Sequence, residues 1–180
     1  MAKGKVAEIL YSSGDLDSAL RILKAEVVPV LDKHGDVRML AVAKGHLARV
    51  HEARGDLDAA IAMHLENMPA AERTGDAQMK MSISSVVARL RLARGVSSQE
   101  EAQQVYDDLA ESYAIARRMG LPPAIVGIGS ELARFLADAD APAEAAKIAD
   151  EVADALAKLG QAENAAAVRA EAAQLRANSK

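Results

Sequence analysis

The sequence contains no cysteine and no tryptophan, and aromatic residues make up only 2% of its 180 residues. The absence of cysteine excludes disulfides, thiolate nucleophiles and cysteine-based zinc sites, and it fits a reducing compartment. The scarcity of aromatic residues disfavours a β-sandwich or barrel, whose strands usually carry aromatic and β-branched side chains. Hydrophobic residues make up 51% of the chain and are mainly aliphatic. Because alanine and leucine form helices readily, this composition predicts an all-α fold.

The sequence also lacks an excess of positive charge, since its formal net charge is −4 and its pI is about 5.6. Most of the affinity of nucleic-acid binders comes from neutralising phosphates, so this charge balance disfavours a nucleic-acid partner. No segment approaches the roughly 20 apolar residues of a membrane span, and no apolar run near the first residue resembles a signal peptide. We therefore expect a cytoplasmic protein that binds neither nucleic acid nor membranes.

Two interleaved series of turn residues divide the chain into repeats. The motif GDLDSA at residues 14–19 recurs as GDLDAA at residues 55–60, and Gly95 and Asp140 take the place of the first glycine in two further copies. The second series comprises Gly35, Gly75, Gly120 and Gly160. Glycine ends a helix at low cost because it adopts the left-handed conformation, and a following Asp caps the next helix. Each of these positions therefore predicts a turn between two helices.

The turns predict nine helices joined by short connections, so that neighbouring helices are antiparallel. Their expected bounds are 3–13, 16–34, 36–54, 56–74, 76–94, 98–119, 122–138, 142–159 and 161–177. We interpret residues 1–180 as one domain of four repeats, about 1–34, 36–74, 76–119 and 121–159, followed by a polar capping helix at 161–178. The opening helix is short, and we expect further repeats or another domain to precede it in a longer protein.

Small residues at fixed distances from the turns carry a resemblance to a known family. Alanine occurs five residues after the turn glycine at Ala19 and Ala60, and seven residues before it at Ala7, Ala48 and Ala88. With the segments SSGDLDSAL at 12–20 and ARGDLDAAI at 53–61, this pattern resembles the tetratricopeptide repeat (TPR) family. The repeat length of about 40 residues is similar to the longer variety in kinesin light chains and Leu-Gly-Asn-repeat scaffolds.

The resemblance covers nearly the whole chain and is strongest in the first two repeats. It implies a right-handed superhelical solenoid of antiparallel helix hairpins, with about four repeats plus a capping helix. It also implies a protein-protein interaction module that holds an extended peptide in a concave groove.

The first helices of repeats two, three and four carry an apolar stripe, at 12, 8 and 5 residues before the turn residue. The members are Ala43, Leu47 and Val50, then Ile83, Val87 and Leu90, then Ile128, Leu132 and Phe135. Stacking of neighbouring repeats buries such stripes continuously. On the second helices we expect the core positions Leu57, Ile61, Leu65 and Met68, and in the third repeat Val105, Leu109 and Ile115.

Pro29 and Pro69 each lie six residues before a turn glycine, inside a predicted second helix. Proline removes a backbone hydrogen bond from a helix interior and costs about 3 kcal/mol there. The sequence therefore predicts either a kinked helix at each proline or an early helix end followed by a turn.

A second stripe on the first helices, at 13, 10 and 6 residues before the turn residue, combines small residues with arginine. We call it the arginine stripe, and its members are Val42, Gly45 and Arg49, then Ser82, Ser85 and Arg89, then Gly127, Ser130 and Arg134. The family resemblance implies that this stripe faces the concave groove. Small side chains leave room for a peptide, and arginine binds carboxylates through two parallel hydrogen bonds. We therefore expect an acidic or C-terminal peptide segment as ligand, although the three arginines could also be ordinary surface residues. Glu8 takes the arginine's place in the first repeat.

Other candidate sites have simpler structural interpretations. The four histidines, His34, His46, His51 and His64, do not share a helix face in a metal-binding spacing, so we expect no metal site. No catalytic constellation or phosphate-binding loop is present, and we expect neither catalysis nor a cofactor. Two other functions remain open, namely self-association into a structural scaffold, with a possible homodimer, and a ligand-sensing regulatory domain of a larger protein.

Overall fold

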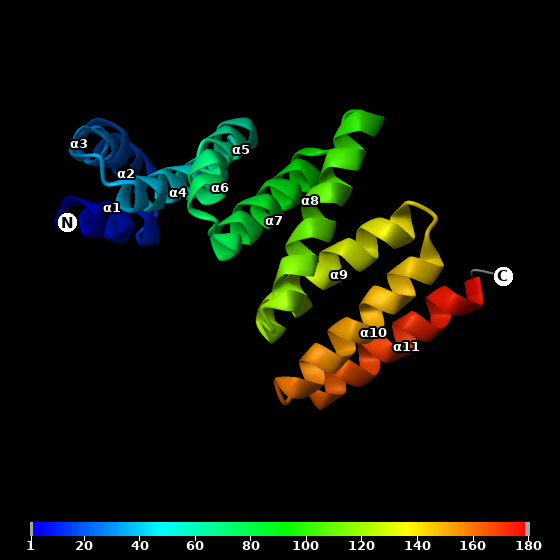
Figure 1. Cartoon of the computed structure of the whole chain (residues 1–180). Coiled ribbons are helices and arrows are strands. Elements are labelled where there is room, and N and C mark those ends of the chain that lie inside the picture. Colours follow the sequence, from blue (N-terminus) through cyan, green and yellow to red (C-terminus); the bar gives the residue numbers. More distant parts are fainter. Residues whose placement is uncertain (1, 179–180) are drawn as a thin grey trace. The chain divides into compact units, whose positions relative to one another are not determined.

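The computed structural model describes residues 2–178, and this part of the chain contains helices and no strand (Figure 1). The elements are α1 (Ala2–Ser12), α2 (Leu16–Ile22), η1 (Leu23–Val27), α3 (Val28–His34), α4 (Val37–Ala53), α5 (Leu57–Leu65), α6 (Met68–Thr74), α7 (Ala77–Arg94), α8 (Gln99–Arg118), α9 (Pro122–Asp138), α10 (Pro142–Lys158) and α11 (Ala162–Asn178). The predicted all-α fold of helix hairpins is confirmed. Residues 1, 179 and 180 of the predicted domain lie outside the described part.

The described residues form two compact units. The first unit comprises residues 2–76 and 93–95, and it contains α1 to α6 with the end of α7. The second unit comprises residues 77–92 and 96–178, and it contains most of α7 and all of α8 to α11. Each unit has its own buried cluster, built around Leu23 in the first and around Leu109 in the second.

The turn residues adopt the backbone conformation that the sequence predicts. Gly55 has a φ of 79°, and Asp140 takes the glycine's place in the fourth repeat with a φ of 59°. The aspartates after the glycines cap the following helices, since Asp15, Asp36 and Asp56 each accept a hydrogen bond from the backbone N–H three residues on, at 3.0 to 3.2 Å. Asp140 is thereby confirmed as the equivalent turn residue of the fourth repeat.

The two prolines have different consequences. In the first repeat the helix continues through a π-helical turn, η1, in which the Val28 N–H reaches the Leu23 carbonyl, and Pro29 lies in the first turn of α3. In the second repeat the helix ends at Leu65 and begins again at Met68, with Pro69 in the first turn of α6. The early helix end is therefore found in the second repeat, whereas the first repeat stays helical through a π-helical turn.

The small residues of the repeat allow close packing within each hairpin. The five alanines at the two repeated positions, Ala7, Ala19, Ala48, Ala60 and Ala88, are at most 1% exposed. Eight of the nine residues of the first-helix apolar stripe are buried, and Phe135 is half-buried. The expectation for Leu65 is wrong, because its side chain is 39% exposed. The helix ends at this residue, so the register of the second helix does not carry through to Met68.

Buried polar side chains connect the two helices of the second and third hairpins. The Asn67 amide donates a hydrogen bond to the Ala41 carbonyl at 3.1 Å, and the Ser112 hydroxyl donates one to the Met81 carbonyl at 3.2 Å. Both donors lie eight residues before the second turn glycine, and both acceptors lie fourteen residues before the first. Val152 takes the donor's place in the fourth repeat. The same cross-hairpin bond is therefore made twice by different side chains.

A glutamate nine residues before the second turn glycine recurs in all four repeats, and each one forms an ion pair. Glu26 pairs with Lys3 at 2.6 Å, Glu66 with Lys44 at 2.7 Å, Glu111 with Lys80 at 2.6 Å and Glu151 with Arg117 at 2.9 Å. The first three pairs join the two helices of one hairpin, whereas the fourth joins α8 to α10. Surface pairs of this kind stabilise a fold by at most about 1 kcal/mol each.

Candidate functional site

The arginine stripe lies outside the core on α4, α7 and α9. Each of its nine residues is exposed or half-buried, while Ala43, Ile83 and Ile128, the residues next to its first members, are at most 8% exposed. The helical period therefore separates two faces of each first helix, one packed and one open to solvent. The stripe is therefore open to solvent, and its contacts differ between the units.

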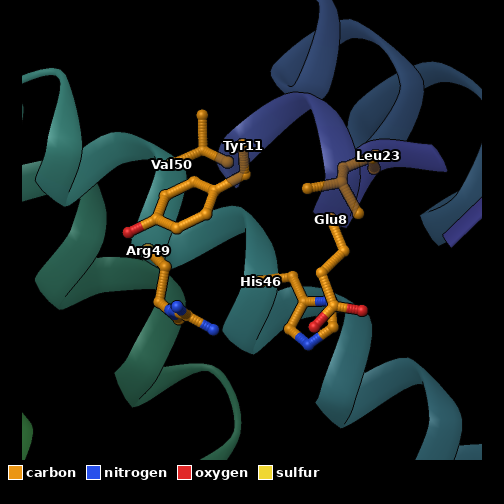
Figure 2. A pocket seen from close by; sticks show the side chains of 7 residues that line it. Glu8, Tyr11, Leu23, His46, Arg49 and Val50 are labelled. Atoms are coloured by element: carbon orange, nitrogen blue, oxygen red, sulfur yellow. The ribbon is translucent and has the colours of Figure 1, made fainter. Parts of the chain in front are cut away.

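In the first unit, Arg49 of α4 stacks on an aromatic ring. Its guanidinium carbon lies 4.8 Å from the centroid of the Tyr11 ring of α1, which is close enough for a cation–π interaction. Figure 2 shows the Arg49 side chain next to the Tyr11 ring, with Glu8 and His46 across from them. This hollow has a volume of about 10 Å³ and is lined by Ala7, Glu8, Tyr11, Leu23, His46, Arg49 and Val50. Arg49 is therefore held beside Tyr11, with Glu8 in the lining of the same hollow.

In the second unit, Arg89 of α7 and Arg134 of α9 both act on Glu131. The pKa of the Glu131 carboxyl is raised above its ordinary value because the group is partly buried, and the two guanidinium groups oppose this shift. Both arginines are thus close enough to stabilise the ionised carboxylate. Glu131 therefore feels the charge of two members of the stripe, and the sequence pattern did not point to this residue.

A larger hollow opens beside Arg134 between α9, α10 and α11. Its volume is about 380 Å³, and its lining comprises Ser130, Ala133, Arg134, Ala137, Asp138, Ala149, Val152, Val168, Glu171 and Leu175. Two residues of the arginine stripe, Ser130 and Arg134, therefore line this hollow. Most of its other lining residues are apolar, and Asp138 and Glu171 are acidic.

The two hollows use equivalent positions of their first helices. Ala7, Glu8 and Tyr11 lie seven, six and three residues before Gly14, and Ala133, Arg134 and Ala137 lie at the same distances before Asp140. A tyrosine in the first unit is thus replaced by an alanine in the second. The larger ring occupies space that the methyl group of Ala137 leaves open, in agreement with the difference between about 10 and about 380 Å³.

Packing does not account for two glycines of the stripe. A Cβ added at Gly45 or Gly127 would meet nothing within 4 Å, whereas at Gly129 it would lie 2.6 Å from Val152 Cγ2. Gly129 is therefore required by the close approach of its neighbours. Glycine inside a helix costs about 0.5–1 kcal/mol relative to alanine, and Gly45 and Gly127 bear this cost without a contact that needs it.

The histidines do not form a site together. His51 Nδ1 lies 3.2 Å from Asp56 Oδ2 at the turn between α4 and α5, and His46 lines the small hollow of the first unit. Within residues 2–178, no group of three histidine, aspartate or glutamate side chains is placed to hold a metal ion. None of the helices in that same range has the length and apolar character needed to cross a bilayer.

Known structures share this arrangement of helices. A kinesin light chain structure from Podosopora anserina with nearly identical TPR-like repeats matches with a TM-score of 0.71 at 19% identity, over 99% of this chain and 91% of that one. MamA matches with a TM-score of 0.57 at 13% identity, over 97% of this chain and 90% of that one. No family model and no curated protein sequence matches the chain. At these identities the likeness shows the fold, which is TPR-like.

Proposed function

We propose that the protein is an interaction module that binds an extended peptide segment of another protein along the members of the arginine stripe within a single unit. The observation that carries this proposal is the hollow of about 380 Å³ beside Ser130 and Arg134, which has room for ligand side chains. The TPR-like fold supports it, since proteins of this fold present the corresponding helix face as a concave binding surface. Catalysis has no support among the described residues.

The small residues of the stripe give a peptide access to the helix surface. Because packing does not require glycine at positions 45 and 127, close approach of a ligand backbone supplies a reason for glycine there. Neighbouring helices lie about 8–10 Å apart, and an extended chain advances about 3.3–3.6 Å per residue. A bound peptide would therefore present roughly every third residue to the next helix of its unit.

The arginines favour a ligand with carboxylate groups, either acidic side chains or a free C-terminus. Glu131 competes with such a ligand, because both guanidinium groups favour its ionised carboxylate. Glu131 would then limit the affinity for weakly acidic sequences. In the Glu131→Gln variant we expect tighter binding of the same acidic peptide.

The test uses a peptide selected from a random library against the full chain, with its affinity measured by fluorescence anisotropy. The triple variant Arg49→Ala, Arg89→Ala and Arg134→Ala should bind at least about tenfold more weakly, a loss of about 1.4 kcal/mol. The matched control replaces Arg38, Arg73 and Arg118, which are exposed arginines outside the stripe, and changes the net charge equally. Equal losses of affinity in both variants would show that the peptide responds only to net charge, which would contradict the proposal. An unchanged affinity in the stripe variant would contradict it as well.

A further inference from the structure

The large hollow beside Arg134 and the small hollow beside Arg49 are built from equivalent positions of their repeats. Each is lined by a first helix, by the second helix of the same hairpin and by the next first helix. The equivalent pairs, counted from the turn residues, are Ala7 and Ala133, Glu8 and Arg134, Tyr11 and Ala137, Leu23 and Ala149, His46 and Glu171, and Val50 and Leu175. The small hollow therefore shows which side chains the large one lacks.

Two large side chains of the small hollow are replaced by alanine in the large one. The ring of Tyr11 gives way to the methyl group of Ala137, and the side chain of Leu23 gives way to that of Ala149. Both replacements remove apolar volume from the same wall. The large hollow therefore keeps an apolar wall but leaves it without a covering side chain.

The small hollow also contains a guanidinium group that the large one does not receive from its own chain. Arg49 lies fourteen residues after Gly35, and its guanidinium carbon lies 4.8 Å from the centroid of the Tyr11 ring. Gln174 lies at the same distance after Gly160 and does not line the large hollow. In the second unit, the place of this cation is therefore open.

Carboxylates surround that open place. Asp138 and Glu171 line the large hollow, and both residues are exposed, so they lie at its mouth. Within residues 2–178, neither side chain forms a hydrogen bond or an ion pair. Arg134 is the one basic residue in the lining, so acidic groups outnumber basic ones there. The charge of the hollow favours a cation.

We propose that the large hollow takes an arginine side chain of the bound peptide, an inference that rests on the proposed function and names a residue that the ligand carries. The methylene groups of arginine pack on the apolar wall formed by Ala137 and Ala149, while the charged head stays at the mouth. There the planar guanidinium donates charge-assisted hydrogen bonds to Asp138 and Glu171. In this way the ligand supplies the cation that Arg49 supplies in the first unit.

The ligand therefore carries charges of both signs. Its carboxylate binds at Arg89 and Arg134, and its arginine enters the hollow at Asp138 and Glu171. A purely acidic segment meets repulsion from these two carboxylates, and an uncharged apolar side chain leaves them without a partner. The hollow thus selects a mixed-charge sequence over a uniformly acidic one.

Fluorescence anisotropy with the library-selected peptide tests the inference. We expect an arginine within about three residues of a carboxylate in this peptide, because an extended chain spans about 10 Å in that distance. Replacing the arginine by citrulline, which keeps the shape but loses the charge, should weaken binding to the parent chain about fivefold. The same replacement should change binding to the double variant Asp138→Asn and Glu171→Gln by less than about twofold.

The matched control for this variant is Glu144→Gln with Glu163→Gln. These are exposed glutamates of the second unit outside the hollow, and the charge change is equal. The control should keep the full citrulline effect, and an equal reduction in both variants would overturn the inference. If the variant of the three stripe arginines loses affinity but citrulline binds as tightly as arginine, the proposed function stands and this inference fails.

A probe without a carboxylate tests the hollow even where no peptide binds the stripe. N-acetyl-arginine methylamide at millimolar concentration should shift the amide resonances of the ¹⁵N-labelled full chain around Asp138 and Glu171. The citrulline analogue should shift them far less, and the Asp138→Asn and Glu171→Gln variant should lose the difference. Equal shifts from the two compounds, or no shift in this region, would contradict an arginine site in the hollow.

Discussion

At the residue scale, a few polar side chains decide local features that hydrophobic periodicity does not predict. Asn67 is 5% exposed at the point where the second helix of its repeat is interrupted, and its amide holds the interruption against α4. The apolar spacing predicts a continuous core stripe through Leu65 and Met68. It could not foresee Asn67, since a lone asparagine gives no periodic signal. The role of the Tyr11 ring was not predicted either. Its effect on the hollow depends on how α1 packs against α4.

The Asn67→Ala variant tests the importance of the cross-hairpin hydrogen bond. Loss of the amide removes the bond to the Ala41 carbonyl and leaves a void, so we expect the free energy of unfolding to fall by about 1–3 kcal/mol. Ser112→Ala should show the smaller loss of the two, because a hydroxyl leaves less space. Denaturant unfolding followed by circular dichroism measures both. Asn164→Ala is the control, since its hydrogen bond to Gln161 is exposed, and a loss as large as that of Asn67 would refute the assignment.

The raised pKa of Glu131 leads to a pH-dependent prediction. Burial disfavours the ionised carboxylate in the folded chain, so the folded state holds this proton more tightly than the unfolded state does. The contribution of Glu131 to stability is therefore fully present below the ordinary glutamate pKa of 4.5. It is lost as the pH rises through the raised value.

The Glu131→Gln variant isolates this contribution, because glutamine does not titrate. The difference in unfolding free energy, parent minus variant, should become more negative as the pH rises from about 4 to 7. Urea unfolding of both proteins across this range measures the difference. A parent chain that gains stability over the variant in that interval would show that Arg89 and Arg134 outweigh the burial of the carboxylate.

At the element scale, the helix hairpin is the unit that the sequence predicts best. The glycine series, the capping aspartates and the buried alanines all depend on neighbouring residues, and the structure agrees with them at nearly every turn. At each proline the sequence predicted either a kinked helix or an early helix end, because proline is compatible with both. The glutamate nine residues before each second turn glycine is a further periodic feature of the sequence. It was not predicted, because the repeat pattern was defined by glycine and apolar positions.

The position of Pro69 in the first turn of α6 leads to a prediction for this element. The first turn of a helix tolerates proline, because its backbone N–H groups have no intrahelical acceptor. Pro69→Ala should therefore change the unfolding free energy by less than about 1 kcal/mol. In contrast, Ala110→Pro within the uninterrupted helix α8 should cost about 3 kcal/mol or more. Thermal unfolding compares the two variants, and a large loss for Pro69→Ala would mean that proline itself maintains the interruption.

At the scale of the whole molecule, the chain consists of TPR-like hairpins in two compact units, with different surroundings for the same stripe. In the first unit, Arg49 is engaged by Tyr11 and the neighbouring hollow is nearly filled. In the second unit, Arg134 borders an open hollow and shares Glu131 with Arg89. The sequence predicted where the stripe lies on each helix. It did not predict which part has free space, because that depends on side chains from neighbouring helices.

The central claim is that a peptide binds along the arginine stripe of the second unit, beside the open hollow at Ser130 and Arg134. Amide chemical-shift mapping of the ¹⁵N-labelled chain with the selected peptide tests this most directly. The account predicts that the largest shifts fall on α9 around Ser130 and Arg134 and on the facing part of α11, with smaller shifts around Arg89. Shifts that concentrate on α8 and leave Ser130 and Arg134 unchanged would contradict it.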